Sequence, residues 1–161
     1  MSDWENPSAA RRQQILRSTR TVAMVGASPN PARASNFVAT YLLSSTDYDV
    51  YFVNPNATKI LGQPVYATLA DLPVVPDIVD VFRRHQDLPG VLEEVLALPP
   101  GVRTWWLQFG LYDVDLARRA EAAGLDVVMD RCLKVEHARF HGGLHLAGFD
   151  TGVISSRRRR P

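Results

Sequence analysis

Five short apolar runs, spaced along the chain and separated by amphipathic segments, predict a parallel β-sheet. The runs lie at residues 22–25, 49–53, 78–82, 102–108 and 126–130. The first continues without interruption into Gly26. A continuous apolar run that ends at a turn residue is typical of a strand buried on both faces of a sheet. We therefore expect five strands, with the first near the centre.

The segments between these runs carry apolar residues at helical spacing. We expect helices at residues 5–18, 36–45, 88–98, 113–123 and 133–139, and a helical turn at 68–72. Ser35 or Asn36 is a suitable N-cap for the second helix. Strands that alternate with helices form βαβ units with right-handed crossovers. The predicted fold class is α/β: a three-layer, doubly wound, Rossmann-like parallel sheet of about five strands.

The length of 161 residues is that of one domain. We expect residues 1–140 to form it, with the helix at 5–18 packed beside the first strand. From Arg139 onward the hydrophobic pattern fades, and residues 141–161 are interpreted as an Arg-rich C-terminal extension and a candidate for disorder. Trp105 and Trp106 point to opposite faces if they lie in a strand, one as core and the other open to an oligomer contact.

Composition and charge narrow the classes of partner. Hydrophobic residues make up 46% of the chain, and no apolar run approaches the roughly 20 residues of a membrane helix. The N-terminus lacks the basic start and apolar stretch of a signal peptide, so a cytoplasmic location is expected. Four of the 18 basic residues lie in the tail, which leaves 14 against 17 acidic ones. We expect neither a membrane nor a nucleic-acid partner.

The candidate chemistry lies where the predicted strands end, because the carboxyl ends of parallel strands line one crevice in doubly wound sheets. The residues at these ends are Gly26, Ala27, Ser28, Asn54, Pro55, Arg83, Arg84, Gln108, Phe109, Gly110 and Cys132. We expect Arg83 and Arg84 to divide, one facing the crevice and the other solvent or a salt bridge.

Residues 26–36 are interpreted as a phosphate-binding loop. A strand that stops at a glycine and leads into a helix presents free backbone N–H groups, and Arg33 adds a cation. The alternative is a plain strand-to-helix turn in which Gly26 permits tight packing. A dinucleotide fingerprint does not fit, because Ser28 and Pro31 replace its second and third glycines. Asn54 also stands where a ribose-binding carboxylate would be, which disfavours NAD-dependent hydride transfer.

Several motifs, taken in order, resemble a known family. They are Val25-Gly-Ala-Ser28 with Pro31, Arg33 and Ser35, then Val53-Asn-Pro55, Val79-Asp-Val-Phe-Arg83, Trp106-Leu-Gln-Phe-Gly110 and Val128-Met-Asp-Arg-Cys132. Together they resemble the small stand-alone CoA-binding proteins, whose domain is similar to the N-terminal CoA-binding domain of the succinyl-CoA synthetase α subunit. The resemblance covers about residues 18–140 and implies a Rossmann-like fold that binds coenzyme A.

The resemblance also implies roles for individual residues. The diphosphate would lie against residues 26–36, which include Gly26, Ala27, Ser28, Arg33, Ser35 and Asn36. Asn54 and Pro55 would face the adenosine, with Lys59 in reach of a phosphate. Val81, Phe82 and Arg83 would wall the cleft, and Gln108, Phe109 and Gly110 would guide the pantetheine arm. The chain has no room for the synthetase's further domains, so the synthetase reaction is not implied.

Cys132 is the single cysteine of the chain. It precedes a predicted helix and follows Arg131, a setting that lowers the pKa of a thiol. A mixed disulfide with coenzyme A is one interpretation, and a small packed residue is the other. His137, His141 and His145 are four residues apart, but Gly142 and Gly143 interrupt the helix, so no metal site is expected.

The sequence therefore predicts a protein that binds coenzyme A or acyl-CoA, as a non-catalytic or regulatory module. The alternative is an enzyme that uses a bound CoA thiol, or an NAD(P) cofactor, in redox or acyl-transfer chemistry. A homo-oligomer and a protein partner both stay open.

Overall fold

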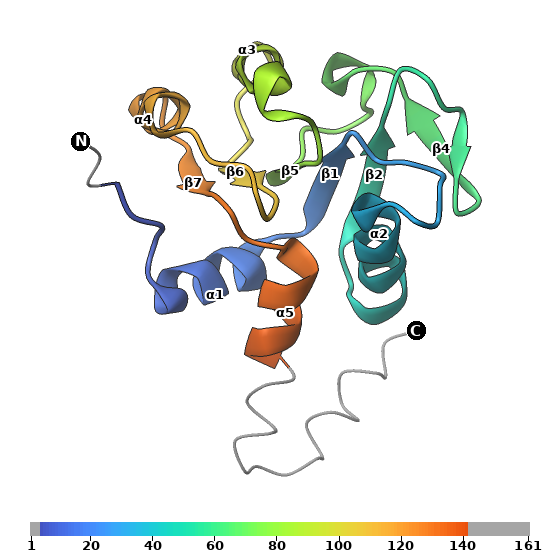
Figure 1. The fold of residues 1–161 in the computed structure, drawn as a ribbon, viewed down its shortest axis with the longest axis horizontal. Coiled ribbons are helices and arrows are strands. Elements are labelled where there is room, and N and C mark those ends of the chain that lie inside the picture. Colours follow the sequence, from blue (N-terminus) through green and yellow to red (C-terminus); the bar gives the residue numbers. More distant parts are fainter. Residues whose placement is uncertain (1–3, 142–161) are drawn as a thin grey trace, which may run out of the picture.

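The computed structural model describes residues 4–141 and shows a seven-stranded sheet between two layers of helices (Figure 1). The strands are β1 (Thr21–Val25), β2 (Asp49–Val53), β3 (Lys59–Ile60), β4 (Gln63–Tyr66), β5 (Ile78–Val81), β6 (Thr104–Leu107) and β7 (Asp126–Val128). The helices are α1 (Ala9–Ser18), α2 (Ala34–Ser45), α3 (Leu88–Leu96), α4 (Val114–Ala122) and α5 (Leu133–His141). Two short 3₁₀ helices are η1 (Leu69–Asp71) and η2 (His85–Asp87).

The strand order is β3-β4-β2-β1-β5-β6-β7, so β1 lies at the centre of the parallel part. The chain leaves β1 for β2 on one side and later crosses to β5 on the other. This reversal opens a crevice at the carboxyl end of β1, as in other doubly wound sheets. The prediction of an α/β, doubly wound parallel sheet is confirmed.

The β3–β4 hairpin enlarges the sheet beyond the five predicted strands. β3 pairs with β4 in antiparallel register, and β4 then pairs with β2 in parallel. Leu61 and Gly62 connect them with positive φ angles of 49° and 77°, the conformation of a tight two-residue hairpin turn. The hydrophobic pattern did not predict this hairpin, because Leu61 is not a residue that signals this conformation.

Two helix starts differ from the predicted ones. α1 begins at Ala9, and its N-cap Ser8 accepts a hydrogen bond from the Arg11 amide at 3.1 Å. α2 begins at Ala34 with Arg33 as the N-cap residue. Ser35 and Asn36, expected as caps, instead lie buried within the first turn. Their polar side chains are thereby directed to the preceding loop, which they support.

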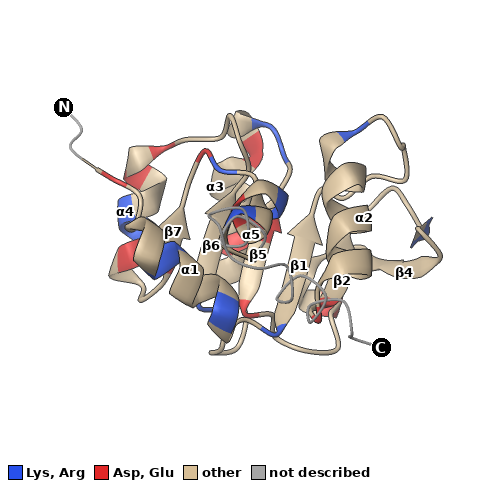
Figure 2. Cartoon of the chain, turned by 90° about the horizontal axis from the view of Figure 1, so that it is seen from below, with Lys and Arg blue, Asp and Glu red and all other residues tan. Residues whose placement is uncertain are grey.

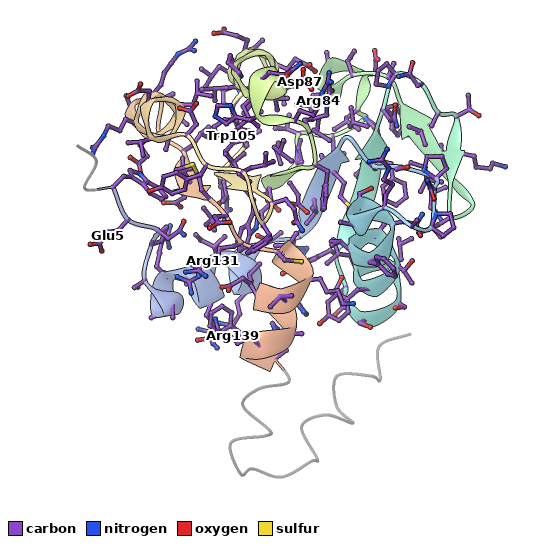
Figure 3. The ribbon with its side chains drawn as sticks, in the orientation of Figure 1. Glu5, Arg84, Asp87, Trp105, Arg131 and Arg139 are labelled. Carbon is purple, nitrogen blue, oxygen red and sulfur yellow. The ribbon has the colours of Figure 1, made fainter. Side chains whose placement is uncertain are left out.

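The core is divided by the sheet into two parts. α3 and α4 cover one face, and α1, α2 and α5 cover the other (Figure 1). Trp105 packs on the α3–α4 side (Figure 3), and Trp106 packs on the opposite side. The two tryptophans lie on opposite faces, as predicted, and both indole side chains are fully buried, so neither presents the surface that an oligomer contact would need.

α1 and α5 are joined by a buried ion pair. Arg12 Nε lies 2.7 Å from Glu136 Oε1, and the Arg12 guanidinium also donates to the Pro7 carbonyl at 2.8 Å. No helix within residues 4–141 has the length and apolar character needed to cross a membrane. The predicted extension beyond residue 141 lies outside the described residues.

Candidate functional site

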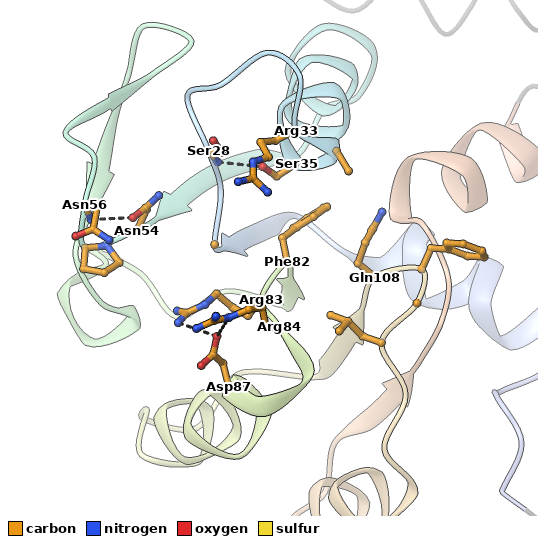
Figure 4. A pocket seen from close by; sticks show the side chains of 16 residues that line it. Ser28, Arg33, Ser35, Asn54, Asn56, Phe82, Arg83, Arg84, Asp87 and Gln108 are labelled. Carbon is orange, nitrogen blue, oxygen red and sulfur yellow. Dashed lines mark hydrogen bonds and ion pairs between the residues drawn. The ribbon is translucent and has the colours of Figure 1, made fainter.

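A cavity of about 630 Å³ lies at the carboxyl ends of β1, β2, β5 and β6 (Figure 4). It is lined by Gly26, Ser28, Arg33, Ala34, Ser35, Asn54, Pro55, Asn56, Phe82, Arg83, Arg84, Asp87, Gln108, Phe109, Gly110 and Leu111. The position is the one expected from the strand ends, since the crevice opens where the strand order reverses.

Gly26 is required by the close approach of two strand ends. Its φ is +86°, and a Cβ at this position would come within 2.3 Å of the Phe82 carbonyl oxygen. Its amide donates to the Val53 carbonyl at 2.9 Å. The tight-packing role considered for this glycine is therefore present, and the same residue also lines the cavity.

The loop between β1 and α2 is held by side chains of the helix that follows. The Ser28 amide donates to Ser35 Oγ, and Asn36 Nδ2 donates to the Ser28 carbonyl, both at 3.0 Å. Ala34 and Ser35 line the cavity in the first turn of α2, where backbone N–H groups have no acceptor within the helix. The partial positive charge of a helix N-terminus makes such a turn a suitable place for a phosphate.

Asn54 ties the end of β2 to the end of β1. Its Nδ2 donates to the Ala27 carbonyl at 2.7 Å, and its Oδ1 accepts from the Asn56 amide at 2.8 Å. The polar groups of this side chain are thus engaged within the protein. Pro55 and Asn56 extend the same wall of the cavity.

The charges in the cavity come from three arginines and one aspartate, a formal net charge of +2. Arg33, the basic position on the loop before the uncharged helix α2 (Figure 2), forms no ion pair with any residue in the described part. Arg83 and Arg84 both contact Asp87 Oδ2, at 3.2 and 3.6 Å. Desolvation raises the pKa of Asp87, but the two arginines lower it more, so its net pKa is below the usual value.

The end of β6 supplies a different surface. Gln108 is nine-tenths buried, and its Oε1 has no hydrogen-bond partner among residues 4–141. Phe109 is 74% exposed, and Gly110 donates its amide to Asp130 Oδ1 at 2.7 Å. This end of the cavity therefore combines an exposed aromatic ring with a buried amide oxygen that can accept a hydrogen bond.

Some predicted residues do not line the cavity. Ala27 and Val81 are buried in the core, and Asn36 supports the loop from behind. Lys59 is exposed on β3, outside the cavity lining. Cys132 packs against the core beneath α2, and its carbonyl accepts the Glu136 amide at 2.9 Å as α5 begins.

Other residues line the cavity without having been singled out as binding residues: Ala34, Asn56, Arg84, Asp87 and Leu111. Arg83 and Arg84 both line the cavity and both pair with Asp87, but they differ in exposure: the Arg83 side chain is 36% exposed and that of Arg84 is 76% exposed. Asp87 follows the two arginines at spacings of four and three residues, a pattern visible in the sequence. The sequence alone did not show that this acid turns back toward the strand end.

Two further groups of titratable residues lie outside the cavity. Tyr41 Oη and His137 Nδ1 are 2.8 Å apart, and the rings of His137 and His141 stack with centroids 4.0 Å apart. No cluster of potential metal ligands is found in residues 4–141, and His145 lies outside them. Asp80 on β5 is fully buried, and neither carboxyl oxygen has a hydrogen-bond partner within the described part of the chain. Burial raises its pKa well above the usual value.

Known proteins similar to this chain point to one family. Residues 20–138 match the family described as the CoA binding domain. The uncharacterized protein YneT of Bacillus subtilis is 37% identical over 134 residues, which span 83% of this chain and 97% of YneT. A hypothetical protein from Pyrococcus horikoshii OT3 has a solved structure that is 32% identical, with a TM-score of 0.78; the match covers 87% of this chain and 99% of that protein.

A more distant match is the ADP-forming acetate–CoA ligase I of Archaeoglobus fulgidus. It is 25% identical over 122 residues, which span 71% of this chain. This region makes up only 18% of the ligase. The chain thus corresponds to one small part of that enzyme.

Proposed function

Because this chain belongs to the CoA-binding domain family, we propose that it binds coenzyme A or an acyl-CoA in the cavity at the carboxyl edge of the sheet. The resemblance inferred from the sequence motifs is confirmed at the level of the family. The residues that make the contacts, and the form of the ligand, are proposals that follow from the geometry described above.

The observation that carries the proposal is the pairing of an open helix start with an unpaired cation. The first turn of α2 and the Arg33 guanidinium face the same cavity, and the cavity as a whole is positively charged. A diphosphate needs several N–H donors and a compensating positive charge, which a helix start and an arginine supply together. Gly26 lines the same cavity.

The remaining parts of the ligand are assigned from the residues at the two ends of the cavity. Figure 4 shows Asn54 and Asn56 at one end and Gln108 at the other, with Phe82 between Arg33 and Gln108. We assign the adenosine to the Asn54–Asn56 end and the pantetheine arm to the Phe82–Gln108 end. The free Gln108 Oε1 would then accept a hydrogen bond from a pantetheine amide.

The proposed role is that of a non-catalytic or regulatory module. The ligase relative favours a second candidate, an enzyme that uses the bound thiol, because this chain corresponds to a piece of a CoA-dependent enzyme. A regulatory role requires that ligand binding be sensed by a partner, whereas an enzyme would turn over an acyl-CoA by itself. Incubating acetyl-CoA with the protein, with water as the acyl acceptor, and monitoring free thiol tests the second candidate: hydrolysis of the thioester to acetate and free coenzyme A would favour an enzyme.

Isothermal titration calorimetry tests the binding proposal directly. The purified chain is titrated with coenzyme A, acetyl-CoA, NAD and ATP under the same conditions. We expect coenzyme A to bind more tightly than NAD and ATP. Tighter binding of NAD would contradict the proposal. The matched control is Arg103→Gln, which removes a surface arginine that contacts Asp77 and does not line the cavity, and which should leave all four affinities unchanged.

A further inference from the structure

We propose that Arg83 and Arg84, which both contact Asp87, form a second anion subsite that binds the 3′-phosphate of coenzyme A. This inference rests on the proposed function, since it concerns the same cavity. It assigns to the protein a preference for coenzyme A over dephospho-coenzyme A, which has the same diphosphate and pantetheine but lacks this phosphate.

The positive charge of the Arg83–Arg84 cluster is only partly neutralised by Asp87. Arg83 Nη2 and Arg84 Nε approach the same oxygen of Asp87, at 3.2 and 3.6 Å. Two guanidinium groups share one carboxylate, so the cluster keeps a formal charge of +1. The two guanidinium groups carry like charges and repel each other. A phosphate has additional oxygens that would accept hydrogen bonds from both arginines.

The Arg83–Arg84 cluster lies apart from the proposed diphosphate loop. Figure 4 shows Arg33 and the Arg83–Arg84 pair on opposite sides of the cavity, with the end of β1 between them. The Arg83 side chain passes beside Gly26, where its Cδ would be 2.8 Å from an added Cβ. The cavity therefore holds two separate basic groups rather than one continuous patch.

The two basic groups of the cavity match the arrangement of the phosphates in coenzyme A. Coenzyme A carries its phosphates in two places: the diphosphate and, across the ribose, the 3′-phosphate. With the diphosphate at α2 and the adenosine toward Asn54 and Asn56, the ribose would lie between the two basic groups. Arg83 and Arg84 extend toward the side where Asn56 lies (Figure 4), whereas Lys59 does not line the cavity.

A purely structural role explains the cluster poorly. The side chains of Arg83 and Arg84 are 36% and 76% exposed. Ion pairs with this exposure contribute little to the stability of a fold, because water screens them and the long side chains lose freedom. Bringing two arginines to the wall of a cavity is instead what recognition of a phosphate requires.

The test compares coenzyme A with dephospho-coenzyme A by calorimetry on the full chain. We expect the wild-type protein to bind coenzyme A at least about tenfold more tightly, the effect of one charge-assisted contact. Arg84→Gln should reduce this ratio to below about threefold and leave the affinity for dephospho-coenzyme A within about twofold of wild type. Arg33→Gln should weaken both ligands by a similar factor and keep the ratio.

The outcomes separate the subsite from the binding function. Equal affinities for the two ligands in the wild type, or a ratio unchanged in both Arg84→Gln and Arg83→Gln, would overturn the subsite and leave the proposed function intact. Absence of coenzyme A binding would overturn both. Arg103→Gln serves as the matched control, and circular dichroism with urea unfolding establishes that each variant is folded.

Discussion

Two clusters in this protein have the same charges and opposite surroundings. In each, one carboxylate contacts two arginines: Glu136 contacts Arg12 and Arg139, and Asp87 contacts Arg83 and Arg84. The Glu136 and Arg12 side chains are 3% and 9% exposed, and only Arg139, at 57%, reaches solvent in that cluster. In the other cluster Arg83 and Arg84 are 36% and 76% exposed. Two clusters with the same formal charges therefore lie in different surroundings.

The difference lies in what else each cluster contacts. Arg12 also donates to the Pro7 carbonyl, so its guanidinium is satisfied within the protein and joins α1 to α5. Arg83 and Arg84 face a cavity and share a single carboxylate oxygen. A buried cluster has to be completed by the protein itself, whereas an open one can be completed by a ligand. Burial, rather than residue type, distinguishes the structural cluster from the one for which we propose binding.

The largest expected effect comes from breaking the buried cluster. Glu136→Gln leaves the Arg12 guanidinium buried without a counter-charge, so we expect the free energy of unfolding to fall by about 3–5 kcal/mol. The matched variant Asp87→Asn, in the open cluster, should leave the free energy of unfolding unchanged within error. Urea unfolding monitored by circular dichroism measures both. Equal losses in the two variants would remove the distinction between the clusters.

A second variant sharpens the comparison with a carboxyl group that is buried but has no arginine. Asp80→Val should raise the free energy of unfolding at neutral pH by about 1–3 kcal/mol, because an unpartnered polar group no longer has to be buried.

The pH dependence of stability provides an independent check on Asp80. Its pKa is raised in the folded state, so the folded protein holds this proton at pH values where the unfolded chain has lost it. Its contribution is therefore most favourable below about pH 3.9 and declines as the pH rises toward the raised folded pKa. The decline should be absent in Asp80→Val. An identical pH profile in the two proteins would mean that Asp80 has a partner.

These effects also show how far the sequence could predict the molecule. The apolar runs predicted the central strands because burial on both faces leaves a continuous pattern. Ile60 and the hairpin around Leu61 were missed, since a two-residue strand has no period. The strand-end rule located Gly26, Arg33 and Gln108 at one cavity. It could not show that Asp87 turns back toward Arg83, because that contact depends on the path of η2.

A further prediction concerns the cavity cation that belongs to neither cluster. Arg33 has no ion-pair partner within residues 4–141, so its replacement removes no salt bridge from the folded protein. Arg33→Gln should weaken coenzyme A binding by about 10- to 30-fold, the effect of losing a charge-assisted contact. Calorimetry measures the affinity, and unfolding should be unchanged. An unaltered affinity would remove Arg33 from the diphosphate site.

The smallest expected effect is on the affinity for coenzyme A when Asp87, the carboxylate of the open cluster, is neutralised. Asp87→Asn keeps an acceptor for the arginines and raises the formal charge of the cavity lining from +2 to +3. We expect coenzyme A to bind about two- to fivefold more tightly at low ionic strength, with the gain lost in high salt. Weaker binding would show that the Asp87 charge positions the arginines rather than competing with the ligand.

The lowered pKa of Asp87 can be observed directly by NMR titration of its carboxyl carbon. The midpoint should lie below 3.8 in the wild type and move upward in Arg84→Gln, because one of the two lowering charges is removed. The interaction with the arginines is present above the unfolded pKa and is lost as the pH falls through the lowered folded value. A midpoint unaffected by Arg84→Gln would argue against the shared contact.

The most direct test of the whole account is a crystal structure of the protein with bound coenzyme A. We predict that the diphosphate lies against the amides of Ala34 and Ser35 with Arg33 beside it, and that the 3′-phosphate contacts Arg83 and Arg84. Coenzyme A bound elsewhere, with this cavity empty, would contradict the account.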